Sequence, residues 1–216
     1  MNKISNRLLS LSKYISKNDK IIDIGCDHAL LDIYLVKNKI VKNIIVSDIS
    51  SKALDQGKKN IEKYKLIKEI ETRIGNGLEV LKEEDHINTV IISGLGTSTI
   101  LNILDNKYIK KINKLIIQSN NDHYKLRKNI VNLGYKIDKE EALEDKKKNY
   151  INIIFTKGIK TYCENELKFG TKNMINKNYY YEYIIQKQKK MLPKITDENK
   201  IKEIKKDIKY LEESKI

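Results

Sequence analysis

The feature that most constrains this chain is an isoleucine-rich run that breaks at a glycine: Ile21-Ile22-Asp23-Ile24-Gly25-Cys26-Asp27-His28. A helical pattern follows it at once. A buried strand that ends at glycine leaves room for a ligand to approach the backbone at its carboxyl end, and the amides of the next helix face that ligand. The run therefore predicts a ligand-binding strand–turn–helix. The alternative is an ordinary strand–turn–helix whose acidic residues have no function.

A second Ile/Val run, 43–46, ends at Ser47-Asp48, and Asp48 lies 23 residues after Gly25. An acidic residue at about 20 residues from the glycine binds a ribose in nucleotide-binding α/β folds. The second glycine of G-x-G-x-x-G is missing, and Asp27 and His28 would repel or crowd a pyrophosphate. The pattern therefore favours a nucleoside ligand with a positive centre and no phosphates. S-adenosylmethionine fits that description.

Length and composition limit the class of protein. The chain has 216 residues, of which 40% are hydrophobic, enough for one sizeable α/β domain and a small appendage. No apolar run approaches the roughly 20 residues that span a bilayer, and residues 1–5 carry no signal-peptide pattern. The two cysteines, Cys26 and Cys163, form no disulfide framework and no metal-binding spacing. We expect a cytoplasmic monomer that needs no membrane and no metal.

The net charge of +14 favours a polyanionic partner, and nucleic acid is the most plausible one. The abundance of Lys, Ile and Asn also fits compositional drift in an A+T-rich genome. Arginine, which phosphate and base recognition usually favours, occurs only at positions 7, 73 and 127. The charge alone does not decide between these interpretations.

Predicted strands and helices alternate along the chain. We expect helices at 4–16, 28–38 and from Ser50 or Ser51 to Tyr64, and strands at 20–25, 43–48, 70–75, 89–92 and 114–118. Strands separated by helices pair in parallel through right-handed crossovers. The strands 134–142 and 150–156 are joined so directly that they must be antiparallel. A parallel sheet with such a terminal hairpin is typical of the class I methyltransferase fold, and is not normal for a Rossmann oxidoreductase.

The character of the sequence changes after Gly158. Charged helices are expected from 163 to 216, and Pro193 separates two of them. Their apolar residues recur at helical spacing and are expected to form core: Tyr183, Ile184, Ile201, Ile204, Ile208 and Leu211. We predict a cofactor-binding domain at 1–160 and a helical coiled-coil hairpin at 161–216. The lysines of the hairpin either contact RNA phosphates or are simply solvated.

From Arg7 to the C-terminal hairpin, the chain resembles the bacterial tRNA adenine-22 N1-methyltransferases. The distinctive motif is D-I-G-x-D-H at 23–28. The others follow in the order of the family: Asp48-Ile49, Gly75-Asn76-Gly77-Leu78, Ser93-Gly94-Leu95-Gly96, Ile116-Ile117-Gln118-Ser119-Asn120, Leu126-Arg127 and Phe169-Gly170. The resemblance implies a mostly parallel seven-stranded sheet of the Rossmann-like methyltransferase class with a C-terminal coiled coil, S-adenosylmethionine as donor and tRNA as acceptor.

Five positions depart from the family pattern, and we expect them near the acceptor side of the pocket: Asp32, Leu95, Thr97, Ser119 and Asn152.

Ten residues are expected to bind the cofactor: Asp23, Gly25, Asp27, His28, Asp48, Ile49, Asn76, Gly77, Ser93 and Gly94. The carboxylate of Asp48 would hold the ribose hydroxyls, unless it caps the next helix. Asn76 would read the adenine amine of the donor, unless it only forms an Asn-Gly turn. His28 would bind the cofactor or the RNA, or start a helix.

Asp27 and Asn120 are the candidate catalytic residues. Methylation at N1 leaves positive charge on the adenine, which the carboxylate of Asp27 would stabilise; the alternative is a helix N-cap. Asn120 can both donate to and accept from an adenine edge. Arg127 is expected to contact a phosphate or to form a structural ion pair.

The predicted function is methyl transfer to N1 of adenine 22 in tRNA. Two alternatives stay open: methylation of another RNA or of a small molecule, and a catalytically inactive RNA-binding module.

Overall fold

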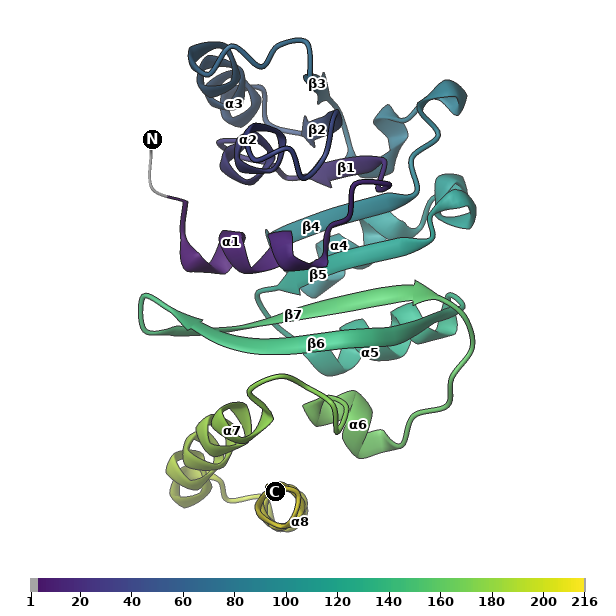
Figure 1. Ribbon diagram of the computed structural model, residues 1–216. Helices are drawn as coiled ribbons and strands as arrows, with labels where there is room; N and C mark the ends of the chain where they lie inside the picture. The colour runs from purple at the N-terminus through teal and green to yellow at the C-terminus, as the bar shows by residue number, and fades with distance from the viewer. Residues whose placement is uncertain (1–3, 216) are drawn as a thin grey trace.

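Isoleucine-rich strands form the centre of the molecule. Within residues 4–215, the part that this computed structural model describes, seven strands make one sheet: β1 (Ile21–Ile24), β2 (Ile44–Asp48), β3 (Ile70–Ile74), β4 (Thr89–Leu95), β5 (Lys114–Ser119), β6 (Tyr135–Asp145) and β7 (Lys148–Lys157). Their order is β3-β2-β1-β4-β5-β7-β6 (Figure 1). The first five strands are parallel, and β7 is antiparallel to both β5 and β6. The predicted fold class is confirmed.

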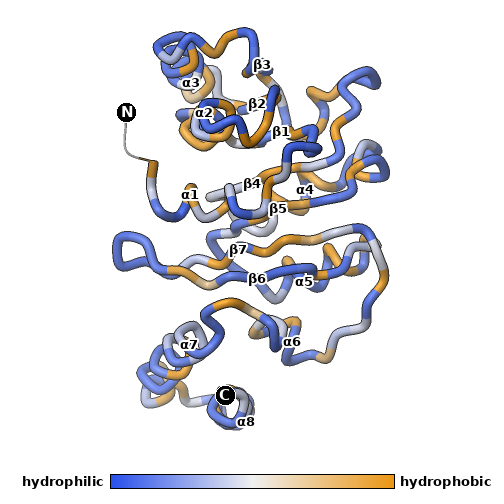
Figure 2. The backbone as a smooth tube through the Cα atoms, in the orientation of Figure 1, coloured by the Kyte–Doolittle hydropathy of each residue, from blue (hydrophilic) through white to orange (hydrophobic). Residues whose placement is uncertain are grey.

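Helices cover both faces of this sheet. They are α1 (Asn6–Leu11), α2 (Leu30–Lys37), α3 (Ser51–Lys63), α4 (Thr97–Leu104), α5 (His123–Asn132), α6 (Glu164–Phe169), α7 (Lys177–Met191) and α8 (Glu198–Glu213). Neighbouring residues of one strand enter opposite clusters: Ile91 packs with α1, α2 and α3, whereas Val90 and Ile92 pack with α4 and α5. Strands buried on both faces carry continuous apolar runs, as Figure 2 shows for the central strands.

The winding of the sheet reverses at β1. Ile24, at the end of β1, lies between Ser47 of β2 and Ile92 of β4. The chain therefore builds β2 and β3 on one side of β1 and then crosses to begin β4 on the other. In open α/β sheets such a switch point leaves a crevice at the carboxyl ends of the strands.

Local backbone conformation shifts one predicted boundary. The helix expected from residue 28 begins at Leu30, because Asp27 and Ala29 have φ of 48° and 51° and cannot join a right-handed helix. The helix after β2 begins where it was predicted, with the hydroxyl of Ser50 accepting the amide of Ala53 at 3.3 Å. Residues 1–3 and 216, on which the signal-peptide expectation and the outer domain limits partly depend, lie outside the described residues.

The two long C-terminal helices form a hairpin whose connection holds Pro193, as predicted. On α8 the predicted residues Ile204, Ile208 and Leu211 are buried. On α7 the prediction for Tyr183 is wrong, because its residue is 39% exposed. The buried residues of α7 are Tyr180, Tyr181 and Ile185. These apolar residues belong to the same cluster as β5 and β7, and a separate unit at 161–216 stays a prediction.

A buried ion pair fastens these helices to the sheet. The Nε of Arg127, on α5, donates to Oε1 of Glu140, on β6, at 2.7 Å, and both side chains are fully buried. The guanidinium also donates to the carbonyls of Leu167 and Lys168 at the end of α6. The other oxygen of Glu140 accepts the amide of Thr171 at 2.6 Å. The structural role expected for Arg127 is confirmed, and the phosphate role is wrong.

We expect Arg127→Met to lower the free energy of unfolding by about 3–5 kcal/mol, because it leaves the carboxylate of Glu140 buried without its counter-ion. Urea unfolding of the full chain measures this change. Lys209→Ala is the matched control, since Lys209 forms an exposed pair with Glu213 at 3.8 Å and its loss should change little. Equal stability of the two variants would contradict the anchoring role.

Candidate active site

The crevice at the switch point holds a cavity of 440 Å³. All ten residues predicted to bind a cofactor line it, although they come from four separate segments of the chain. The carboxyl ends of β1, β2 and β4 supply most of them, and the turn after β3 adds Asn76 and Gly77. Three of these side chains are acidic, namely Asp23, Asp27 and Asp48, so the cavity suits a cationic ligand.

The loop after β1 faces the cavity with its backbone, because Gly25 has no side chain. The amides of Gly25 and Cys26 donate to the carbonyl of Ser47 at 2.8 and 3.3 Å, which ties the loop to β2. Gly25 has φ of +76°, and a Cβ on it would lie 3.4 Å from Leu95. A side chain there would be strained and would fill space that a ligand needs.

Asp27 does not cap the next helix, so that alternative is wrong. The cap position is Ala29, which makes no side-chain capping bond. The carboxylate of Asp27 is 69% exposed and lies 3.5 Å from Nε2 of His28, whose side chain is also half exposed. His28 precedes α2 and contributes its backbone carbonyl, which accepts from Asn60 at 2.9 Å. Both side chains are free to meet a ligand.

Asp23 lies deeper, beside a second carboxyl group. Burial, together with the smaller effect of the nearby charge of Asp48, raises the pKa of Asp23 to about 7. Asp32, in the first turn of α2, is fully buried, and neither of its oxygens has a hydrogen-bond partner among the described residues. Burial, followed by the charge of Asp23, raises the pKa of Asp32 well above its ordinary value. Burial therefore favours the protonated form of Asp32, which adds no charge beside Asp23.

Asp48 orders the turn that follows β2. Its Oδ1 accepts the amide of Ser50 at 2.8 Å, and Ser50 is itself the cap of α3. The helix-cap alternative for Asp48 is therefore wrong, and its Oδ2 remains for a ligand. Ile49, the next residue, is 73% exposed and lines the cavity, where it offers an apolar surface to a flat ring.

The turn after β3 has the conformation of the Asn-Gly alternative. Gly77 has φ of +58°, and the amide of Glu79 donates to the carbonyl of Asn76 at 3.2 Å. The side chain of Asn76 donates weakly to Glu79 at 3.3 Å and leaves its amide oxygen free. The turn places the side chain of Asn76 at the cavity, so both roles are compatible.

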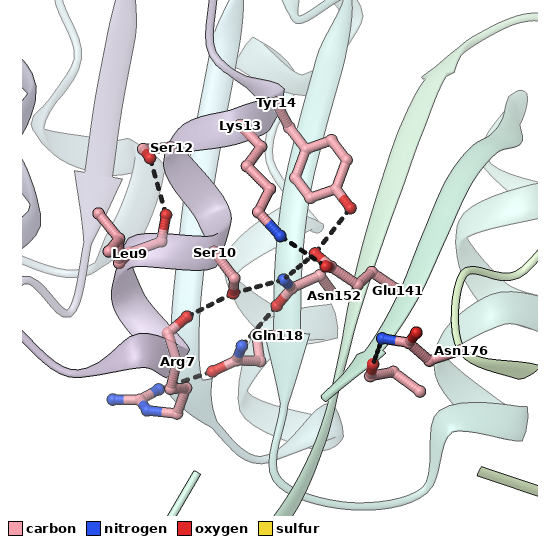
Figure 3. Close-up of polar contacts among 11 residues, drawn as sticks. Arg7, Leu9, Ser10, Ser12, Lys13, Tyr14, Gln118, Glu141, Asn152 and Asn176 are labelled. Atoms are coloured by element: carbon pink, nitrogen blue, oxygen red, sulfur yellow. Dashed lines mark hydrogen bonds and ion pairs between the residues drawn. The ribbon is translucent and has the colours of Figure 1, made fainter. Parts of the chain in front are cut away.

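Arg7 closes the cavity from the N-terminal helix, and sequence reasoning did not assign it to the site. Its Nη1 donates to Ser93 at 2.8 Å. The same atom donates to Gln118 at 2.8 Å (Figure 3). Gln118 in turn donates to Asn152, whose amide donates to Ser10 at 2.7 Å. The chain has only three arginines, and this rarity was the one sequence signal that could have indicated Arg7.

Most of the five departing positions, expected near the acceptor side of the pocket, do not line the cavity. Only Leu95 lines the cavity. The others are buried inside the protein, with exposed fractions of 2% or less: Asp32, Thr97, Ser119 and Asn152. Thr97 and Ser119 bond to each other at 2.9 Å, and Asn152 belongs to the network of Arg7. Their sequence signal concerned the support of the site, not the surface that meets an acceptor.

Asn120 lies outside this cavity, in a neighbouring one. Its Nδ2 donates to the carbonyl of Gly94 at 2.6 Å, which leaves Oδ1 pointing away as an acceptor. The two candidate catalytic residues, Asp27 and Asn120, therefore line adjacent cavities that share Arg7 and Gly94.

In residues 4–215 no group of three or more His, Cys, Asp or Glu side chains is placed to hold a metal ion. No helix in that range is long and apolar enough to cross a membrane.

Comparison with known proteins agrees with this geometry. Residues 4–154 match the family described as "Methyltransferase domain". The tRNA (adenine(22)-N(1))-methyltransferase of Bacillus subtilis (strain 168) is 33% identical over 150 residues, which are 68% of this chain and 63% of that relative. The chain thus matches a little less than two thirds of that relative's length.

Solved structures match over nearly the whole chain. M. capricolum TrmK, in complex with S-adenosyl-homocysteine, is 36% identical, with a TM-score of 0.85 over 97% of this chain and 96% of that one. A protein in the NADB-Rossmann superfamily from Streptococcus agalactiae is 26% identical, with a TM-score of 0.89 over 99% and 98% of the two chains.

The sheet with its antiparallel terminal hairpin, and the acidic cavity at its switch point, define a class I methyltransferase fold. Within that class the chain belongs to the methyltransferase-domain family and, more narrowly, to the TrmK family of tRNA (adenine-22 N1)-methyltransferases.

The Asp23–Asp32 pair predicts that stability falls with rising pH. A carboxyl group whose folded-state pKa is raised stabilises the fold fully below its unfolded value of 3.8. That contribution is lost as the pH rises towards the folded pKa, which for Asp23 is about 7. Asp32→Asn removes one titrating group while it keeps the shape and a hydrogen-bond donor.

We therefore expect the melting temperature of Asp32→Asn to exceed that of the parent by a margin that grows between pH 5 and pH 7. The difference in the free energy of unfolding should grow by roughly 1 kcal/mol per pH unit at most. Each kcal/mol shifts the melting temperature by about 2–4 °C. Asp55→Asn, which changes an exposed carboxylate on α3, is the control. A margin that is the same at every pH would show that Asp32 is ionised in the folded protein.

Proposed function

We propose that the protein transfers the methyl group of S-adenosylmethionine to N1 of an adenine in tRNA, at position 22. The observation that carries this proposal is the acidic cavity at the ends of β1, β2 and β4 in a chain of the TrmK family. The name of the B. subtilis relative supports the acceptor, and the bound product in M. capricolum TrmK supports the donor. We retain the expectation of a cytoplasmic monomer.

The residues of the cavity fit S-adenosylmethionine. The cavity volume of 440 Å³ is in the range of small-molecule sites. Asp48 would hold the ribose with its free oxygen, while Ile49 and Asn76 would meet the adenine ring and its amine. Asp23 would hold a cationic group of the ligand, and the bare backbone at Gly25 would lie beside it. When bound, the cofactor supplies a methyl group on a positively charged sulfur that leaves as a neutral thioether.

The protein mainly has to position the acceptor and stabilise its charge. The N1 atom of adenine is paired in a duplex, so the base must be unpaired or flipped out before its lone pair can react. Alignment of the two reactants can supply several kcal/mol of the rate acceleration. Asp27 would stabilise the charge that develops on the methylated ring. Oδ1 of Asn120 would accept a hydrogen bond from the exocyclic amine, since its Nδ2 is engaged by Gly94.

We expect Asp48→Ala to weaken binding of S-adenosylmethionine by about 10- to 100-fold, because it removes a charge-assisted hydrogen bond. Isothermal titration calorimetry measures the dissociation constant. Asp55→Ala, which removes an exposed carboxylate on α3, is the control and should bind S-adenosylmethionine as the parent does. Unchanged affinity in Asp48→Ala would exclude the ribose role of this residue.

We expect the parent protein to transfer labelled methyl groups to unmodified tRNA transcripts and to yield 1-methyladenosine on nucleoside analysis. The label should disappear when adenine 22 is replaced. Asp27→Ala should lower kcat by on the order of 10²-fold, with cofactor affinity changed far less. No transfer to any tRNA, despite measurable cofactor binding, would reject the tRNA assignment and favour another acceptor.

A further inference from the structure

A second cavity, of 650 Å³, adjoins the cofactor cavity and has a different character. The two share Arg7 and Gly94. The remaining lining residues of the second cavity are Asn120, Lys147, Lys148, Asn149, Tyr150 and Tyr183. They come from the end of β5, the β6–β7 turn and the C-terminal helix α7, so this cavity joins the methyltransferase sheet to the helical hairpin.

The charges of the two cavities are opposite. Asp23, Asp27 and Asp48 line the first together with Arg7, whereas none of the described residues that line the second is acidic. Arg7, Lys147 and Lys148 give the second cavity three cationic side chains. The first therefore suits a cationic ligand, and the second suits an anionic one such as a phosphodiester.

Two tyrosines give the basic cavity aromatic surface. The guanidinium of Arg7 lies over the ring of Tyr150, 5.4 Å from its centroid. Tyr183 is 39% exposed, so its ring is accessible from solvent. Aromatic rings beside basic groups are the features with which proteins bind unpaired nucleotides, because every base can stack on a ring.

Contacts between α7 and β6 position Tyr183 at the second cavity. The helix α7 begins against β6, where the amide of Ala142 donates to the carbonyl of Ile175 at 3.0 Å. The side chain of Asn176 donates to the carbonyl of Ala142 at 2.8 Å (Figure 3). One turn before Tyr183, the hydroxyl of Tyr179 donates to Glu144 at 2.9 Å, beside the β6–β7 turn.

The ring of Tyr183 is also supported from within α7. It stacks on the ring of buried Tyr180, with the centroids 6.4 Å apart. Residues four positions apart lie on the same face of a helix, so the contact of Tyr179 with the hairpin directs Tyr183 towards it as well.

The lysines stand on a backbone turn that does not favour them. Lys146 and Lys147 connect β6 to β7 with φ of 51° and 63°, the conformation in which two-residue hairpins usually have Asn-Gly. Figure 2 shows this tip as hydrophilic and projecting beyond the sheet. The turn thus presents consecutive cationic side chains at the mouth of the second cavity.

We propose that the basic cavity binds an unpaired nucleotide of the RNA substrate, with its base against Tyr183 and its backbone phosphate at Lys147 and Lys148. This inference rests on the proposed function and deepens it. The C-terminal helix α7 then forms part of the acceptor site, and Arg7 and Gly94 mark the boundary across which the base meets the cofactor.

The test compares Tyr183→Ala with Tyr183→Phe, and the double variant Lys147→Asn/Lys148→Ala with Lys205→Ala/Lys206→Ala. Asparagine tolerates the positive φ of residue 147, and Lys205 and Lys206 are exposed lysines of α8, away from the cavity. Calorimetry with S-adenosylmethionine checks that each variant folds and keeps the cofactor site.

For methyl transfer to tRNA, Tyr183→Ala should raise KM by about 10- to 100-fold, and Tyr183→Phe should restore it, because phenylalanine keeps the stacking surface. The cavity double variant should raise KM and reduce the salt dependence of RNA binding by about one to two units of slope. The α8 double variant should do less of both. Equal KM for parent, Tyr183→Ala and the cavity double variant would overturn the inference and leave the proposed function standing.

If the parent methylates no tRNA, the proposed function fails, and fluorescence anisotropy with a labelled single-stranded oligoribonucleotide still decides the inference. Binding that Tyr183→Ala and the cavity double variant weaken, and the α8 double variant does not, supports the nucleotide site. Binding that is equal in all of them overturns it.

Discussion

The reversal of the sheet's winding at β1 is the constraint on which the rest of the structure depends. Because β2 and β4 both pair in parallel with β1, the ends of the three strands lie side by side. Asp23, Asp48 and Ser93 are 25 to 70 residues apart in the sequence and reach one cavity for this reason. The antiparallel strand β7 runs back to the start of β5, where the amide of Lys157 donates to the carbonyl of Asn113 at 3.0 Å, and the segment after it carries the chain to α7 beside Ala142 of β6.

Arg7 couples this cavity to the remainder of the fold. It donates across to Ser93 and Gln118, and through Asn152 the contacts extend to Ser10 and Glu141. Glu141 also accepts from Lys13 at 2.7 Å and from Tyr14 at 2.9 Å. A buried polar network is stabilising only when its members are satisfied together, and here the satisfied members hold α1 rigidly against β5, β6 and β7.

Features that depend on residues close together in the chain could be predicted from the sequence. Strands of isoleucine, the glycine at 25 and the acidic residue at 48 signal their own positions, and the cofactor cavity follows once the strands are parallel. Arg7 and Tyr183 could not be predicted, because their roles come from contacts with segments far away in the chain. Helical spacing placed Tyr183 in the core, but Tyr180 and Tyr181 occupy the buried face of the helix instead. Asp32 was noticed as unusual, but only burial shows that it supports Asp23.

The adjacent cavities have to keep two ligands of opposite charge apart. A surface with a net charge of +14 repels a cationic cofactor as it attracts RNA. Charges in solvent are screened over roughly 8 Å at physiological ionic strength, so the charged groups that line each cavity decide which ion enters it. Burial favours the protonated form of Asp32, which adds no further charge beside Asp23. The acidic cavity can thus remain acidic within a basic protein, and the lysines of the β6–β7 turn remain available to the polyanion.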